Sequence, residues 1–383
     1  MAAGSAYPAL RQRMISLDVL RGVTVAFMIM VNNEGDGDHA WSFMRHADWN
    51  GMTPTDLVFP TFLFVVGASI VFAFAARLEQ GATRSELAWR SLRRAGVLFA
   101  LGLIVNSFPQ FHLESLRVYG VLQRIAICYL AAALLHLWCS DARSKIVTAA
   151  LALIGYWVLL RWVPVPRYGV PGREIAFLDP DANLVAWIDR QIFSASHLYE
   201  KVRDPEGLLS NLPALASVLI GMLAGMWLQT QRTLEHKAAG LVAAALALLV
   251  AGYAWGLWLP LNKKLWTSSY VLAAAGWSTL ALAVCFWIVD ARGWRKAWTW
   301  IPLVFGSNAI IAYMFSELLA STLWSVHWSD GSNQTDLQKY AFQHFFMPLG
   351  DAGLAAFAYS IAFTVICFVP VWVLYRAKIF VKV

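Results

Sequence analysis

Long runs of hydrophobic residues recur along almost the whole chain and are separated by short polar connections. Each run approaches the roughly 20 residues that an α-helix needs to cross the hydrocarbon core of a bilayer. Because lipid cannot satisfy exposed backbone groups, these runs are predicted to be helices. We expect about ten membrane spans, near residues 17–33, 55–76, 91–107, 119–138, 145–163, 208–230, 237–259, 266–290, 299–323 and 354–376.

The connections between these runs alternate in charge. Arg and Lys concentrate in 1–16, 77–94, 139–145, 231–237, 291–298 and 376–383. The opposite connections are 34–54, 108–118, 164–207, 260–265 and 324–353. The positive-inside rule then places both termini in the cytoplasm. We therefore predict an all-α, polytopic membrane helix bundle, N-in and C-in. It forms one domain over residues 1–383, with outer-face loops at 34–54, 164–207 and 324–353.

The composition agrees with a membrane protein, because 59% of the 383 residues are hydrophobic and only 14% are charged. A soluble domain carries about 25% charged residues. The formal net charge of +7 serves mostly to anchor the inner loops and gives no case for nucleic acid as a partner. The cysteines form no CxxC or Cys/His pattern, so we expect neither disulfides nor a metal site. They are Cys128, Cys139, Cys285 and Cys367.

Polar residues near the predicted outer face are the first candidates for function, because ionisable groups in a membrane are costly. Asn33 ends the first span, His46 follows in the string "HADWNG", and Asp56 begins the second span. Imidazole is the side chain best suited to carry a proton near neutral pH. Each residue also has a structural alternative: a helix cap for Asn33, a solvated loop side chain for His46, and a helix start capped by Thr53 for Asp56.

Further polar residues lie in or beside the later spans and are binding candidates: Gln123, Arg124, His197, Lys264 and Asn308. Structural alternatives remain open for these too. Arg124 could snorkel or form a structural ion pair, and Asn308 could make a helix–helix hydrogen bond. Lys263, next to Lys264, is interpreted mainly as an interfacial anchor.

At the inner face, the string "SLDVLRG" places Asp18 and Arg21 three positions apart on one side of a helix. An ordinary ion pair is the simpler interpretation. The functional alternative is a polar group that borders the route of an anionic cytoplasmic ligand.

Six strings, spread along nearly the whole chain, resemble those of a known family and occur in the same order. They are "SLDVLRGVTVAFMIMVNN", "HADWNGMTPTDLVFPTFLFVVG", "GVLQRIAICY", "DPEGLLSNLPALASVLIGMLAG", "PLNKKLWTSSYVL" and "FGSNAIIAY". The chain resembles the heparan-α-glucosaminide N-acetyltransferase family, including its bacterial members. The resemblance implies transfer of acetyl from cytoplasmic acetyl-CoA to an amino sugar, or an amino-sugar oligosaccharide, across a bacterial inner membrane. No metal is implied.

The resemblance also implies roles for individual residues. The family's proposed active-site histidine matches His46, and its important asparagine matches Asn33. His46 would then be a general base or an acetyl carrier, and Asn33 a donor to the oxyanion. From their chemistry alone, and not from the resemblance, we expect Asp56 to orient His46, and Arg124 or Lys264 to pair with donor phosphate or an acidic acceptor.

Two other functions remain open from the sequence. A sugar or small-molecule permease could line its pathway with the same polar residues, although the lack of an internal repeat disfavours the common transporter folds. An O-acetyltransferase of cell-envelope polysaccharide would make esters in place of amides. The sequence identifies neither the acceptor nor the oligomeric state, and a homodimer is one of the states that remain open.

Overall fold

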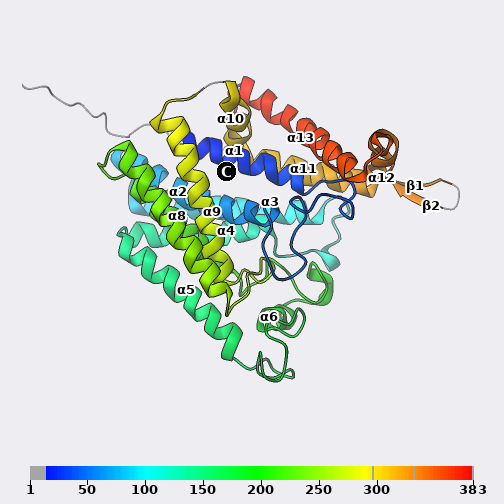
Figure 1. Cartoon of the computed structure of the whole chain (residues 1–383), viewed down its shortest axis with the longest axis horizontal. Helices are drawn as coiled ribbons and strands as arrows, with labels where there is room; N and C mark the ends of the chain where they lie inside the picture. Colours follow the sequence, from blue (N-terminus) through cyan, green and yellow to red (C-terminus); the bar gives the residue numbers. More distant parts are fainter. Residues whose placement is uncertain (1–13, 296, 331–332, 382–383) are drawn as a thin grey trace, which may run out of the picture.

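The computed structural model describes residues 14–295, 297–330 and 333–381, and helices dominate it (Figure 1). The long helices are α1 (Ile15–Val31), α2 (Val58–Glu79), α3 (Arg84–Ser107), α4 (Val121–Trp138), α5 (Ala142–Trp162), α7 (Asn211–Leu228), α8 (Leu234–Gly256), α9 (Ser268–Cys285), α11 (Ala309–Ser325) and α13 (Ala352–Arg376). Shorter helices are α6 (Leu184–Ile192), α10 (Trp300–Ser307) and α12 (Leu337–Ala341). One hairpin pairs β1 (His327–Asp330) with β2 (Asn333–Asp336).

Seven helices of the described ranges are long and apolar enough to cross a membrane, and a bent pair would make an eighth span. Each predicted span overlaps a helix, but two helices fall outside this set of eight. α1 has 17 residues, and the first half of α3 carries a cluster of charged side chains. The chain is therefore a multi-pass membrane protein. The count of ten and the orientation stay predictions.

The predicted ninth span, 299–323, is wrong as one continuous helix. α10 and α11 meet at Asn308 with a bend of 75°. Asn308 leaves helical geometry, with φ −130° and ψ 44°. Its amide nitrogen donates to the Ile379 carbonyl at 3.1 Å, and its amide oxygen accepts from the Val381 N–H at 2.9 Å. The amide thus bonds a distant segment of chain at the point where the helix breaks.

Glycines allow two pairs of helices to touch backbone to backbone. A Cβ at Gly67 of α2 would lie 1.9 Å from the Val218 carbonyl oxygen, and one at Gly221 of α7 would lie 2.0 Å from that of Phe64. A Cβ at Gly22 of α1 would likewise lie 1.7 Å from a carbonyl oxygen of α10. Small residues drive helix association in membranes by permitting such close approach. These contacts fix α1 and α2, which flank the loop that carries His46.

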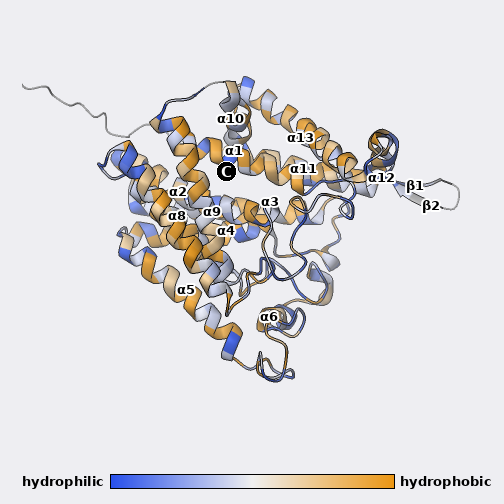
Figure 2. Ribbon diagram, in the orientation of Figure 1, coloured by the Kyte–Doolittle hydropathy of each residue, from blue (hydrophilic) through white to orange (hydrophobic). Residues whose placement is uncertain are grey.

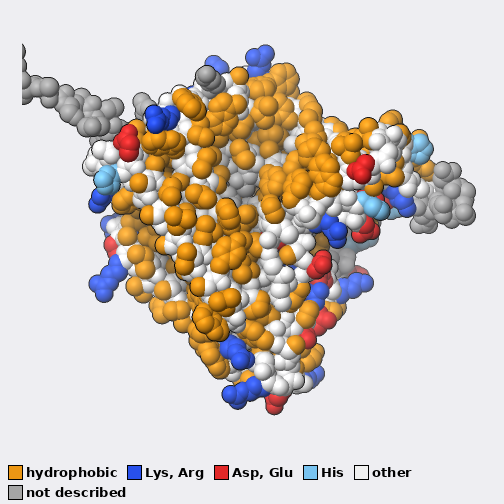
Figure 3. Space-filling view, viewed as in Figure 1, with side chains coloured by type: hydrophobic (Ala, Val, Ile, Leu, Met, Phe, Trp, Pro, Cys, Tyr) orange, Lys and Arg blue, Asp and Glu red, His pale blue; other side chains and the backbone are white. Residues whose placement is uncertain are grey.

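The surface agrees with a bilayer environment. Hydrophobic residues dominate the long helices, and hydrophilic ones gather in the connections (Figure 2). The face shown in Figure 3 is largely hydrophobic, with charged side chains at its edges. The connection after α1, α6, α12 and the hairpin lie on the same side of the molecule, at the right of Figure 1. The candidate site lies among these connections.

Candidate functional site

His46 and Asp56 are joined directly. The Nδ1 atom of His46 lies 2.7 Å from Oδ1 of Asp56. The Asp56 side chain is 1% exposed, whereas that of His46 is 43% exposed. A carboxylate at Nδ1 favours the tautomer with its proton there, which puts the basic lone pair on Nε2. The pair therefore has a buried carboxylate that orients an accessible imidazole.

The sequence "TPTD" builds this carboxylate into the start of the second span. Oδ2 of Asp56 accepts from the Thr53 N–H at 2.9 Å, from the Thr53 hydroxyl at 3.1 Å and from the Ala47 N–H at 3.1 Å. The first of these bonds matches the predicted helix start, in which the third residue reaches back to the cap. A 3₁₀ turn, Thr55–Leu57, leads from there into α2. The structural and functional interpretations of Asp56 are thus compatible.

Lys263 completes a three-residue group with this pair. Its Nζ lies 3.0 Å from Nδ1 and 3.2 Å from Nε2 of His46, and 3.8 Å from Oδ1 of Asp56. Two contacts hold the loops together: the Gly51 N–H donates to the Leu261 carbonyl at 2.7 Å, and the amides of Asn50 and Asn262 lie 3.3 Å apart. The loop before α9 thereby brings an ammonium group to the imidazole.

Burial lowers the pKa of Lys263, and the nearby charges of Asp56 and Glu206 oppose this shift. A lysine of lowered pKa changes its charge more readily near neutral pH than an exposed one. The group therefore places a lysine that loses its charge at a lower pH than an exposed lysine beside His46.

A second polar group surrounds Arg117. Its guanidinium binds Asp204 through two nitrogens, at 2.8 and 2.6 Å, and Glu206 at 2.5 Å. Burial lowers the pKa of Arg117, but the two carboxylates outweigh this effect and raise it. Glu206 also acts electrostatically on Lys263. Glu206 of the string "DPEG" therefore binds Arg117 directly and affects Lys263 through its charge.

Arg124 and Gln123 of α4 are both fully buried. One Arg124 nitrogen donates to the Pro205 carbonyl at 3.0 Å and to the hydroxyl of Ser210, and the guanidinium lies over the Trp266 ring at 4.8 Å. The other two Arg124 nitrogens and both amide atoms of Gln123 have no partner in the described ranges. Arg124 thus braces the loop that carries Glu206.

Three predicted residues make structural contacts here. The Asn33 amide donates to the Ile29 carbonyl at 2.8 Å. Lys264 forms an ion pair with Glu200 at 3.1 Å, and Nδ1 of His197 lies 2.6 Å from the Leu116 carbonyl. Among the contacts of the described residues, none joins these three to His46.

Two of the three remaining predicted residues, Asp18 and Arg21, lie in α1, toward the end of the helix away from His46. Arg21 donates to Asp18 at 2.9 Å, which is the predicted ion pair, and also to the Ser69 hydroxyl at 2.7 Å and the Gly306 carbonyl at 3.3 Å. These contacts join three helices. Asn308 lies at the break between α10 and α11, where it bonds chain atoms.

Sequence reasoning missed Lys263, Arg117 and Glu206 as members of the site. Two signals were present: "PLNKKL" holds paired lysines beside an asparagine, and "DPEG" holds two carboxylates. The choice of Lys264 over Lys263 depended on the direction of each side chain, which adjacent identical residues do not reveal. Arg117 lies in the short connection between α3 and α4, which resembles an ordinary loop.

This arrangement of groups suits acyl transfer to an amine. A histidine oriented by a carboxylate can accept a proton from a nucleophile or act as the nucleophile itself. A neighbouring cation can stabilise negative charge on a carbonyl oxygen in the transition state.

Comparison with known proteins agrees with this chemistry. Residues 13–253 match the family model described as heparan-alpha-glucosaminide N-acetyltransferase, catalytic. The human heparan-alpha-glucosaminide N-acetyltransferase is 28% identical over 433 aligned residues, which cover 98% of this chain and 60% of the human protein. The mouse protein of the same name is 28% identical over 80% of this chain and 54% of its own length. The chain thus spans less than two thirds of either relative.

Proposed function

The chain belongs to the heparan-alpha-glucosaminide N-acetyltransferase catalytic family, and from this premise we propose that it transfers an acetyl group from acetyl-CoA to the amine of an amino sugar. The donor would come from the cytoplasm and the acceptor from the periplasm of a bacterial inner membrane. Acetyl-CoA is the co-substrate, and the proposal requires no metal.

The single observation that carries this proposal is the contact of His46 with Asp56. An amine attacks a thioester only after it has lost its proton, so a base must lie at the point of attack. In His46, Nδ1 is held by the Asp56 carboxylate at 2.7 Å. A partly exposed imidazole with that partner is a suitable base for an amine that arrives through the outer loops.

The neighbouring groups have supporting roles in this proposal. Asp56 keeps the imidazole in one orientation and stabilises its protonated form after it takes the proton. Lys263, 3.2 Å from Nε2, supplies positive charge where the thioester oxygen becomes negative. Asn33 could add a hydrogen bond there if its amide turned away from Ile29. The leaving thiolate of CoA takes up a proton, and the acceptor amine becomes an amide.

The inner face supports binding of the donor. The described inner connections are rich in Arg and Lys, and phosphate groups favour arginine geometry. Asp18 and Arg21 lie in α1, on the same helix that leads to Asn33. A nucleotide bound near the inner connections would direct its pantetheine along the helices toward His46.

The test uses purified full-length protein, labelled acetyl-CoA and glucosamine, with mass spectrometry of the product. Wild-type protein should form N-acetylglucosamine. His46→Ala should lower the rate by at least about 10²–10⁴-fold and leave the affinity for acetyl-CoA unchanged. His39→Ala is a matched control, because His39 also binds an aspartate, Asp36, at 2.9 Å in the same connection, but the Asp36 side chain is 31% exposed against 1% for Asp56.

Three outcomes would contradict the proposal or redirect it. Normal turnover by folded His46→Ala protein would remove the central residue from the mechanism. An ester product in place of an amide would favour the O-acetyltransferase, and sugar uptake without acetyl-CoA would favour the permease. An acetylated His46 formed from donor alone would establish the two-step route within the proposed function.

A further inference from the structure

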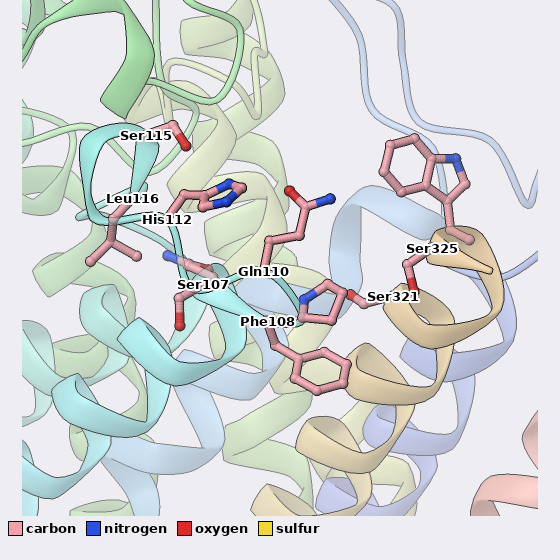
Figure 4. A pocket seen from close by; sticks show the side chains of 11 residues that line it. Ser107, Phe108, Gln110, His112, Ser115, Leu116, Ser321 and Ser325 are labelled. Atoms are coloured by element: carbon pink, nitrogen blue, oxygen red, sulfur yellow. The ribbon is translucent and has the colours of Figure 1, made fainter. Parts of the chain in front are cut away.

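A pocket of about 200 Å³ lies between the end of α3 and the last turns of α11. Its lining includes amide, hydroxyl and imidazole side chains beside two aromatic rings: Asn106, Phe108, Gln110, His112, Ser321 and Trp324. In Figure 4, Ser321 and Ser325 of α11 face His112 and Ser115 across this space. The end of α3, which supplies part of the pocket wall, and the connection after α1 both lie toward the right of Figure 1.

The lining is suited to a sugar. Amides, hydroxyls and imidazole can donate and accept hydrogen bonds, as the hydroxyl groups of a sugar require. Aromatic rings supply a flat apolar face beside a polar rim. Pockets for drug-sized ligands occupy about 300–1,000 Å³. A volume of about 200 Å³ therefore fits one sugar ring better than an oligosaccharide.

One face of α11 continues this polar lining inward. Ser325, Ser321, Glu317 and Tyr313 are spaced four apart, so they lie along the same side of the helix. Glu317 lies about 6 Å along the helix axis from Ser321, beyond the residues that line the pocket. In the part of the chain that the structure describes, its carboxylate has no hydrogen-bond or ion-pair partner, although Arg117 acts on it electrostatically. A half-buried carboxylate without a direct partner is costly unless a ligand supplies one.

A series of contacts connects this pocket with His46. Asn106 of the pocket wall donates to the Arg117 carbonyl at 3.0 Å. The Arg117 side chain binds Glu206 at 2.5 Å, and Glu206 acts electrostatically on Lys263 beside His46. Glu206 also interacts with Tyr313, the residue one turn deeper than Glu317. Arg117 and Glu206 therefore link the pocket wall to the His46 group.

We propose that this pocket receives a single amino-sugar ring and that Glu317, four residues from Ser321 on the same face of α11, binds the protonated amine. This inference rests on the proposed function and deepens it, because it assigns the residue that selects the acceptor. A carboxylate forms a strong, charge-assisted hydrogen bond with a compact ammonium group. It binds the hydroxyl of a neutral sugar at the same position much more weakly. Glu317 would hold the amine until His46 removes the proton.

The test compares variants of the full-length protein. Glu317→Gln keeps the shape of the side chain and removes its charge. It should raise the KM for glucosamine roughly 10- to 100-fold and leave the KM for acetyl-CoA unchanged. Glucosamine binding measured without acetyl-CoA should weaken by the same factor. Wild-type protein should bind glucosamine more tightly than glucose, and Glu317→Gln should lose this preference.

A second variant keeps the test decisive if Glu317→Gln does not fold. Ser321→Trp fills the pocket and should abolish glucosamine binding, while acetyl-CoA still binds. Thr322→Trp is its matched control, because Thr322 is the next residue of α11, is exposed and does not line the pocket. This control should bind glucosamine normally.

The two proposals can fail separately. Unchanged glucosamine binding in both Glu317→Gln and Ser321→Trp would overturn the acceptor pocket, even if the wild-type protein acetylates glucosamine. Binding that depends on Glu317 without any acetyl transfer would support the pocket and reject the enzyme function.

Discussion

The ammonium nitrogen of Lys263 lies 3.0 Å from Nδ1 of His46, although 217 positions separate the two residues in the sequence. The contact joins the connection after α1 to the connection before α9. It places a basic group of variable charge against the imidazole that we propose as the base. Any account of the pH dependence of this protein must therefore include Lys263.

Substitution of Lys263 should change both the rate and its pH dependence. Burial lowers the pKa of Lys263, so its positive charge is lost as pH rises to values where an exposed lysine is still protonated. Lys263→Arg should retain activity and move the alkaline limb of the pH–rate profile upward, because Arg stays charged. Lys263→Met should lower kcat. Identical alkaline limbs in wild-type and Lys263→Arg protein would mean that another group titrates there.

Asp56→Asn should lower kcat by about 10²–10⁴-fold, because an amide cannot hold the imidazole tautomer as a carboxylate does. Thermal unfolding must accompany the kinetics, since Asp56 also accepts two bonds from Thr53. Asp48→Asn is the control, because Asp48 is exposed in the same connection. Comparable losses in both variants would indicate a general effect of charge.

Asn33→Ala should lower kcat by about 10²–10³-fold if the amide stabilises the oxyanion, with little change in acetyl-CoA affinity. The Asn33 amide now donates to the Ile29 carbonyl, so the role requires this bond to exchange during the reaction. Asn32→Ala, at the exposed neighbouring position, should behave as wild type. A rate for Asn33→Ala within twofold of wild type would leave Asn33 with only a helix-end role.

Asp189 in α6 should make the stability of the connection between α5 and α7 depend on pH. Burial raises the pKa of Asp189 from 3.8 to about 7, and the charge of Asp204 adds to the shift. The unfolded chain loses this proton near pH 3.8 and the folded chain near pH 7, so stability falls as pH rises between these values and is flat above them.

Asp189→Asn should therefore flatten the pH dependence of thermal unfolding between about pH 4 and 7 and raise the melting temperature at pH 8. Asp181→Asn, at an exposed position in the same loop region, is the control and should keep the wild-type slope. An unchanged slope in Asp189→Asn would show that other groups govern the pH dependence.

The helical class and the approximate positions of the helices could be predicted from the sequence, because lipid leaves a long apolar run few alternatives. The break at Asn308 could not. The surrounding residues are apolar on both sides, and the bend depends on bonds to Ile379 and Val381, about 70 positions away. Local patterns contain no information about such a partner.

The part of the candidate site that could be predicted is the part whose residues lie close together in the sequence. His46 and Asp56 lie ten positions apart, so a short loop brings them together. Lys263 and Glu206 come from distant connections, and their placement depends on how the loops pack. Glu317 was missed because one carboxylate inside an apolar helix shows no sign in the sequence of the pocket beside it.

The bonds of Asn308 have a practical consequence for protein engineering. Removal of the residues from Ile379 onward would leave both polar atoms of the Asn308 amide without these partners at the bend that orients α11. A shortened C-terminus would then disturb the helix that carries Glu317 and alter sugar recognition from a distance. Affinity tags at that end should therefore follow an intact Val381, and a loss of acceptor binding after trimming should first be attributed to the bend.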